Sequence, residues 1–184
     1  MKYKLREYPQ FSACGLNCGL CPRYYTNGPS RCPGCGGEGF TEQHCGCSIL
    51  GCCERHGVAY CFLCEEYPCK KYEGADLTDS FISHKNQFKD MDKATEVGME
   101  AYQAELNKKI RILESLLEHY DDGRRKSFFC TAVNLLELED VHTVMEQIAV
   151  EALPELSLKE KAKVAAHLFE EMAAKRDISL KLRK

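Results

Sequence analysis

The sequence predicts a mainly α-helical protein in which a small, loop-rich cysteine domain precedes an all-α helical bundle. The first 73 of its 184 residues hold 12 of the 13 cysteines, 10 of the 13 glycines and 5 of the 6 prolines. They contain only ten Leu, Ile, Val or Phe residues, which is too few for a core of their own. After residue 73 apolar residues recur at helical spacing. We therefore divide the chain into residues 1–73 and 74–184 and expect about five helices in the second part.

The first two helices of the bundle are predicted from an N-cap residue, a glycine that interrupts the helix and a stripe of apolar residues. Asp79 or Ser80 is expected to cap a helix that continues until Gly98, because Ser and Asp favour N-cap positions and glycine interrupts helices. From Met99 onward apolar residues recur at steps of three and four as far as Tyr120. This second stretch is the strongest amphipathic helix in the sequence.

Three more helices follow. The segment that Ser127 opens is apolar on nearly every side, which predicts a buried helix. A stripe from Val141 to Ile148 predicts the next. Ser157 and Glu160 match a capping box at the start of the last helix. The basic tail over residues 181–184 is expected to fray.

The compartment decides how the cysteine domain is held together. The first ten residues lack the apolar run of a signal peptide, and no later stretch is long enough to span a membrane. We therefore expect a cytoplasmic protein, in which clustered cysteines stay reduced and bind soft or borderline metals. A metal-stabilised domain is the prediction, and a disulfide-bonded one is the alternative.

Three CxxC pairs supply the pattern that metal binding needs. They are Cys18–Cys21, Cys32–Cys35 and Cys61–Cys64. Two intervening residues let both sulfurs of one turn reach an ion at about 2.3 Å, and two such turns complete a tetrahedron. Pro33 and Gly34 make the second pair the best match to a turn whose backbone N–H groups point at sulfur.

The spacing suggests two zinc ions. We predict that the first is bound by Cys18, Cys21, Cys32 and Cys35, and the second by Cys47, Cys52, Cys61 and Cys64. The cysteines left over are Cys14, Cys45, Cys53 and Cys69. These can complete a third site, stay unbound, or exchange into the first two, Cys14 for Cys18 and Cys69 for Cys47 or Cys52. His44 and His56 are the only histidines among these cysteines and are candidate ligands.

Charge and energy are consistent with such sites. A zinc ion with four thiolates carries a net charge of −2, which nearby cations can offset. The candidates are Arg23, Arg31, Arg55, Lys70 and Lys71. A structural zinc site contributes on the order of 10–16 kcal/mol to folding in small peptides, enough to replace a missing core.

The cysteine string resembles a known family. The matching residues are Cys14-Gly15-Leu16-Asn17-Cys18-Gly19-Leu20-Cys21-Pro22, Cys32-Pro33-Gly34-Cys35, Cys47-Ser48-Ile49-Leu50-Gly51-Cys52 and Cys61-Phe62-Leu63-Cys64-Glu65-Glu66-Tyr67-Pro68-Cys69. Over roughly the first 73 residues this string is similar to the cysteine-rich prokaryotic proteins known as domain of unknown function 3795. The resemblance implies a small zinc-binding protein of bacteria or archaea. It does not extend to the helical half or to the adjacent Cys52–Cys53 pair.

Two other functions remain alternatives. Cys14, Cys18 and Cys21 form CxxxCxxC, which holds a [4Fe–4S] cluster in radical S-adenosylmethionine enzymes, but that class needs a partial α/β barrel and the chain after residue 76 predicts only helices. An iron–sulfur cluster protein of another kind, with a redox function, is the first alternative. A thiol-reactive or metal-transfer protein is the second.

The rest of the sequence favours a non-catalytic role. Cys130 follows two phenylalanines and is interpreted as a buried small residue in preference to a thiolate activated by the preceding basic triplet. The chain has no nucleotide-binding glycine loop, no HExxH and no nucleophile elbow. With a net charge of −3, neither half is basic enough to favour nucleic acid. We predict a zinc-binding interaction or regulatory module whose helical half binds a protein partner, with no membrane partner and with the oligomeric state left open.

Overall fold

The computed structural model describes residues 5–43, 46–75, 77–152 and 154–184. Over these residues the chain forms seven α-helices, three short 3₁₀ turns and no strand, so the mainly helical class is confirmed. The helices are α1 (Phe40–Gln43), α2 (Ser48–Arg55), α3 (Gln87–Val97), α4 (Met99–His119), α5 (Lys126–Leu135), α6 (Leu138–Glu151) and α7 (Leu158–Lys175). The 3₁₀ turns are η1 (Cys18–Leu20), η2 (Cys61–Leu63) and η3 (Lys70–Tyr72).

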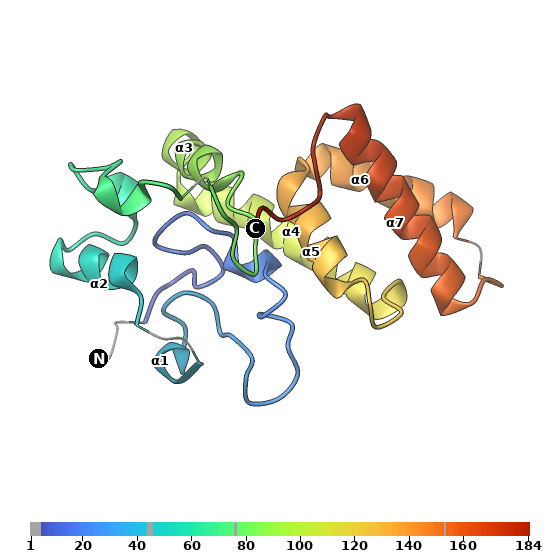
Figure 1. Cartoon of the computed structure of the whole chain (residues 1–184), viewed down its shortest axis with the longest axis horizontal. Helices are drawn as coiled ribbons and strands as arrows, with labels where there is room; N and C mark the ends of the chain where they lie inside the picture. Colours follow the sequence, from blue (N-terminus) through green and yellow to red (C-terminus); the bar gives the residue numbers. More distant parts are fainter. Residues whose placement is uncertain (1–4, 44–45, 76, 153) are drawn as a thin grey trace.

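The two parts of the chain differ in architecture. Residues up to about 75 form loops with the short helices α1 and α2, and they lie to one side of the molecule, opposite α6 and α7 (Figure 1). The five helices of the second part follow one another through short connections. Within the described residues no helix is both long enough and apolar enough to cross a membrane.

The first helix of the bundle starts later than predicted. Helix α3 begins at Gln87, so neither Asp79 nor Ser80 caps it. The carboxylate of Asp79 instead accepts hydrogen bonds from the backbone N–H groups of His84 and Arg183, at 2.8 and 2.7 Å. The break at Gly98 is confirmed: its φ of 84° belongs to the left-handed region, which glycine enters without strain and which separates α3 from α4.

Polar contacts fix the C-terminal end of α5. The Asn86 side-chain amide donates to the carbonyls of Asn134 and Leu135, both at 3.2 Å. The ammonium of buried Lys109, on α4, donates to the carbonyl of Leu136 at 2.6 Å. These bonds satisfy carbonyl groups that the end of a helix leaves without intrahelical partners.

Helices α6 and α7 pack together as a hairpin. The predicted capping box at Ser157 and Glu160 is present at the start of α7. At its other end Arg176 forms hydrogen bonds with both carboxylate oxygens of buried Asp140 on α6, the shortest at 2.6 Å. This bidentate ion pair closes the end of the hairpin opposite its loop.

One hydrophobic core serves both parts of the chain. Phe11 and Leu20 from the loops, Met91 from α3, Leu113 from α4 and Phe129 from α5 all lie in the same buried cluster and have no exposed surface. Turn η1 packs against α4 and α5, and η2 packs against α3. The loop-rich segment therefore buries its apolar side chains against the helices behind it.

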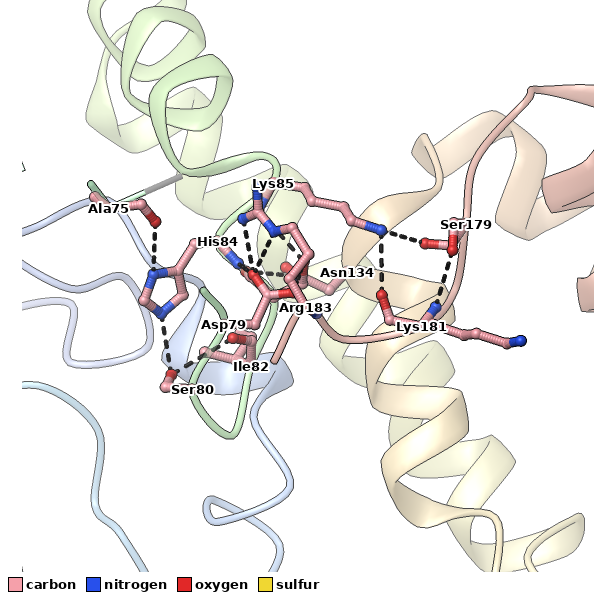
Figure 2. A network of polar contacts seen from close by, with 11 residues as sticks. Ala75, Asp79, Ser80, Ile82, His84, Lys85, Asn134, Ser179, Lys181 and Arg183 are labelled. Atoms are coloured by element: carbon pink, nitrogen blue, oxygen red, sulfur yellow. Dashed lines mark hydrogen bonds and ion pairs between the residues drawn. The ribbon is translucent and has the colours of Figure 1, made fainter. Parts of the chain in front are cut away.

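The C-terminal tail is anchored, which corrects the expectation that it frays. After α7 the chain turns back to the centre of the molecule (Figure 1). There the Lys85 ammonium donates to the carbonyls of Ser179 and Lys181, and Arg183 pairs with Asp79 (Figure 2). The tail thus ties the segment before α3 to the end of the bundle.

Candidate metal centre

Two of the three CxxC pairs adopt the same local geometry. Cys18–Cys21 and Cys61–Cys64 each begin a 3₁₀ turn, and the N–H of the second cysteine donates to the carbonyl of the first, at 3.1 and 2.9 Å. Cys21 and Cys64 leave these turns with nearly identical backbone angles, φ −83° and ψ 137° against φ −87° and ψ 135°. The shared spacing therefore produces a shared turn that places two sulfurs side by side.

The third pair, Cys32–Cys35, is held in place by a residue outside its own turn. Gly34, inside Cys32–Cys35, has φ of 87°, and the N–H of Cys35 donates to the carbonyl of Pro9 at 2.8 Å. A Cβ atom at position 34 would lie 2.3 Å from that carbonyl oxygen. Glycine is required here both for the backbone angle and for the close approach of the N-terminal loop.

Long-range hydrogen bonds bring these turns together. The N–H of Gly19 donates to the carbonyl of Gln10 at 2.9 Å, and the N–H of Cys61 donates to the carbonyl of Ala13 at 2.9 Å. Tyr72 reaches back to the carbonyl of Cys14 through its hydroxyl, at 3.4 Å, and the Gln87 amide donates to the same oxygen at 2.7 Å. The segment around residues 10–19 is therefore the centre on which the other cysteine turns assemble.

The cysteines gather in two places. The first thiol group comprises Cys14, Cys18, Cys21, Cys32, Cys35 and Cys47, each of which lies within electrostatic range of another member. The second thiol group comprises Cys52, Cys53, Cys61, Cys64 and Cys69, which line one cavity together with His56. No disulfide joins two described cysteines. Cys45 and His44 lie outside the described residues.

This division differs from the sequence assignment in one respect. Cys18, Cys21, Cys32 and Cys35 all belong to the first thiol group, and Cys52, Cys61 and Cys64 to the second, as proposed from spacing. Cys47, however, interacts with Cys14 and Cys35 of the first group. Its place beside the second cavity is taken by Cys53, which immediately follows Cys52 on α2.

Only Cys35 of the first thiol group is fully buried, and its other five members are half-buried. Burial raises the pKa of Cys14 to about 11 and that of Cys18 well above its ordinary value, and neighbouring thiols add to both shifts. Three of its sulfurs have polar partners: Ser12 Oγ lies 3.0 Å from Cys14 Sγ, Arg6 donates to Cys35 at 3.6 Å, and the N–H of Leu50 donates to Cys47 at 3.4 Å. A cation at the centre of this group would replace protons that burial now retains.

The second thiol group has a buried pair at its base. The sulfurs of Cys53 and Cys61 lie 3.5 Å apart. The hydrogen bond from Cys53 lowers the pKa of Cys61 to about 6, against the opposing effect of burial and with support from the Tyr72 hydroxyl. The same bond, together with burial, raises the pKa of Cys53. Within the pair, ionisation of Cys61 is therefore favoured over ionisation of Cys53.

The donor set fits a tetrahedral thiophilic cation, although it is not closed around one. Among the described residues no group of three or more His, Cys, Asp or Glu side chains is arranged to hold a metal ion. Two sulfurs bound to the same zinc ion stand about 3.8 Å apart, a distance close to that between Cys53 and Cys61. The cavity has a volume of about 20 Å³, room for one small guest. Cys52, Cys64, Cys69 and His56 line the same cavity and are the candidates for the remaining ligands.

Sequence reasoning missed the cation nearest to both groups. The Arg6 guanidinium lies 4.5 Å from the centroid of the Tyr60 ring, bonds to Cys35 of the first group, and also lowers the pKa of Cys61 of the second. Of the basic residues proposed from sequence, Lys71 lines the second cavity. Arg23 acts to lower the pKa of Cys21 while its guanidinium stacks on Phe81, and Arg31 stacks on Tyr24. Nothing in the local pattern around Arg6 signals this role, because its contacts lie up to 55 residues away.

A buried polar network around Asn17 was also not predicted from the sequence. The Asn17 amide, next to Cys18, donates to Asp90 on α3 at 2.9 Å and to Asn134 on α5 at 3.3 Å, and it accepts from the Tyr102 hydroxyl on α4 at 2.9 Å. One side chain thus orients η1 against three helices. Burial raises the pKa of Asp90 to about 7, against the opposing effect of Lys109.

Cys130 is buried in α5, as its neighbours predicted, with 1% of its surface exposed. Burial raises its pKa, so the preceding basic residues do not activate it.

Comparison with known proteins identifies the cysteine-rich segment. Residues 10–74 match a family described as "Protein of unknown function (DUF3795)", which confirms the resemblance of the cysteine string. The match ends before α3, so all five helices of the bundle lie outside it. No curated protein and no solved structure matches the chain.

Proposed function

We propose, from the geometry of the DUF3795 segment, that this chain is a zinc-binding protein whose thiolate sites hold the N-terminal half in its fold and whose role is non-catalytic. The observation that carries the proposal is the convergence of eleven described thiols, from Cys14 to Cys69, on two places in a segment with little regular structure. Thiols packed at this density repel one another once ionised. A divalent cation removes that repulsion and supplies the missing folding free energy, about 10–16 kcal/mol per site in small peptides.

Outside the second thiol group, where His56 Nδ1 lies 4.0 Å from the Cys64 sulfur, three histidines lie away from any nucleophile, which supports an interaction or regulatory role. The ring of His84 lies between the Ala75 carbonyl and the Ser80 hydroxyl, at 3.2 and 3.1 Å. His119 and His167 lie at the surface beside Glu118 and Glu171. These three rings are engaged with structural partners and not with a nucleophile. The helical half, which the family match does not cover, is the part proposed to contact a protein partner.

Metal analysis of the full chain tests the proposal. Protein purified without oxygen is expected to be colourless and to contain at least two zinc ions per chain, one for each thiol group. Removal of zinc by a strong chelator is expected to lower the thermal unfolding midpoint and to reduce the circular dichroism signal, and added zinc is expected to restore both.

Two results would overturn this function. Iron with charge-transfer absorbance in the visible range would place the chain among iron–sulfur proteins, the first alternative. Unchanged thermal unfolding after complete removal of metal would show that the thiol groups do not hold the fold.

A further inference from the structure

The second thiol group contains more metal donors than one ion can use. Its cavity is lined by Cys52, Cys53, His56, Cys61, Cys64 and Cys69. A structural zinc ion binds four ligands, so two of these six donors are surplus for a single ion. The cavity volume of about 20 Å³ leaves room for a small cation.

The six donors differ in how deeply they are buried. Cys53, on α2, and Cys61, in η2, are 3% and 8% exposed, and their sulfurs lie 3.5 Å apart. Cys52, Cys64 and Cys69 are half-buried, and His56 is exposed with its Nδ1 atom 4.0 Å from the Cys64 sulfur. A buried pair at the base therefore faces a ring of four donors that solvent can reach.

Charge around the cavity favours a cation held by thiolates. Lys71 lines it, and the Arg6 guanidinium lies behind the buried pair, against the Tyr60 ring. These two positive charges offset the excess negative charge of a zinc ion with three or four thiolates. Glu66 also lines the cavity but stands among residues exposed to solvent.

The sulfurs of the first thiol group have different hydrogen-bond partners. Its members Cys14, Cys35 and Cys47 form hydrogen bonds with Ser12, Arg6 and the backbone of α2. Hydrogen bonds of this kind orient metal-bound sulfurs and retain them in place. In the second group Cys61 bonds to Cys53 and to the Tyr72 hydroxyl, so the buried pair is held by the scaffold. The outer sulfur of Cys64 lies 4.0 Å from the exposed His56 ring, a partner less fixed than Ser12 or the backbone of α2.

We propose that the second thiol group is an exchangeable zinc site, anchored by Cys53 and Cys61 and closed by any two of Cys52, His56, Cys64 and Cys69, from which the ion passes to a thiol-bearing acceptor. This inference rests on the proposed zinc function and adds that the two groups differ in kinetics. The first keeps its ion, and the second delivers it.

The transfer step is a ligand exchange without electron transfer. An acceptor thiol loses its proton and its sulfur binds the zinc ion, while one outer protein thiolate leaves the ion and takes up a proton. Repetition moves the ion from four protein donors to the acceptor, and a surplus protein donor can occupy the vacated position at each stage. Zinc remains divalent throughout. Exchange of one thiolate for another leaves the charge unchanged, whereas departure of the neutral His56 ring adds one negative charge to the zinc complex and releases the acceptor's proton to solvent.

The test uses the zinc-loaded full chain and a chromophoric zinc chelator in excess as the acceptor. Release is expected in two phases, with about one zinc ion per chain in the fast phase. C61S removes half of the anchor and is expected to abolish the fast phase and lower the zinc content by one ion per chain. C64S leaves five donors for four positions and is expected to keep the full zinc content. C130S, which changes a buried cysteine outside both groups, is the matched control and is expected to behave as the wild type.

The outcomes separate the two proposals. A chain that binds zinc but releases all of it in one slow phase overturns the exchangeable site and leaves the proposed function standing. Equal zinc loss from C64S and C61S also overturns it, because the donors would then not be surplus. A chain that binds no zinc overturns the function itself. The zinc-release kinetics of the wild type test the exchangeable site even where a variant fails to fold.

Discussion

The guanidinium of Arg183 lies 2.8 Å from the carboxylate of Asp79, which is 104 residues earlier in the chain and whose side chain has no exposed surface. The backbone N–H of Arg183 donates to the same carboxylate at 2.7 Å (Figure 2). Burial by itself would raise the pKa of Asp79, but these bonds and the one from the His84 N–H outweigh it and lower the pKa to about 2. The second-last residue of the chain is therefore part of the fold.

Replacing Arg183 should destabilise the protein. R183A leaves a buried carboxylate with only its backbone donors and the Ser83 hydroxyl, 3.4 Å away, and we expect the free energy of unfolding to fall by about 2–4 kcal/mol. K181A is the matched control, because the Lys181 side chain points away from the network (Figure 2) while its backbone carbonyl stays in place. Urea denaturation of zinc-saturated protein measures both. Equal midpoints for the two variants would contradict the role of the ion pair.

The Asp90 carboxyl should make stability depend on pH. Burial raises its pKa to about 7 in the folded chain, whereas the unfolded chain has the ordinary value near 3.9. The folded state therefore binds the additional proton, and the stability that this group contributes is greatest below about pH 4 and is lost as pH rises through 7. The slope from one proton is at most about 1.4 kcal/mol per pH unit.

Asparagine at position 90 removes this proton and keeps an oxygen that can accept from Asn17. We expect the unfolding midpoint of D90N to vary less than that of the wild type between pH 5.5 and 7.5, with zinc saturating in both. The difference between the two proteins isolates Asp90 from the titration of the thiols. D79N serves as control, because the pKa of Asp79 lies far below this window. Parallel pH curves for D90N and wild type would refute the prediction.

A methyl group at Gly34 should disrupt the cysteine turn. G34A places its Cβ 2.3 Å from the Pro9 oxygen that holds Cys35. G28A is the matched control, because Gly28 has nearly the same φ, 85° against 87°, but nothing lies within 4 Å of its Cβ position. Both variants carry the strain of a left-handed alanine, and G34A should lose about 1–3 kcal/mol more. Thermal unfolding of the pair checks the difference.

Arg6 should influence zinc binding in both groups. R6Q removes the guanidinium that bonds to Cys35 at 3.6 Å and stacks on Tyr60, leaving the thiolates less well compensated. We expect about tenfold weaker zinc affinity in competition with a chelator, the order seen when an outer partner of a metal site is lost. R31Q removes an arginine that also stacks on a tyrosine, Tyr24 at 5.3 Å, and should leave the affinity unchanged. Identical affinities for R6Q and R31Q would exclude the proposed role.

The sequence by itself determined the class of the protein and most of its helices. Helix α4 and the capping box of α7 follow from contacts between residues three or four positions apart, and such contacts are visible in the order of the residues. The CxxC spacing likewise predicted local turns, because the turn that joins Cys18 to Cys21 is built from those residues alone.

Only the tertiary structure decided which turns meet. Cys47 joins the first thiol group, although spacing suggested the second, and Cys53, which spacing left unassigned, joins the second. The direction of a side chain on or next to α2 depends on how that helix packs. Asn17, Asp79 and Arg6 each interact with a residue 55 to 117 positions away, which is beyond the reach of any local pattern. Their environments arise from the shared core, which exists only once loops and helices have come together.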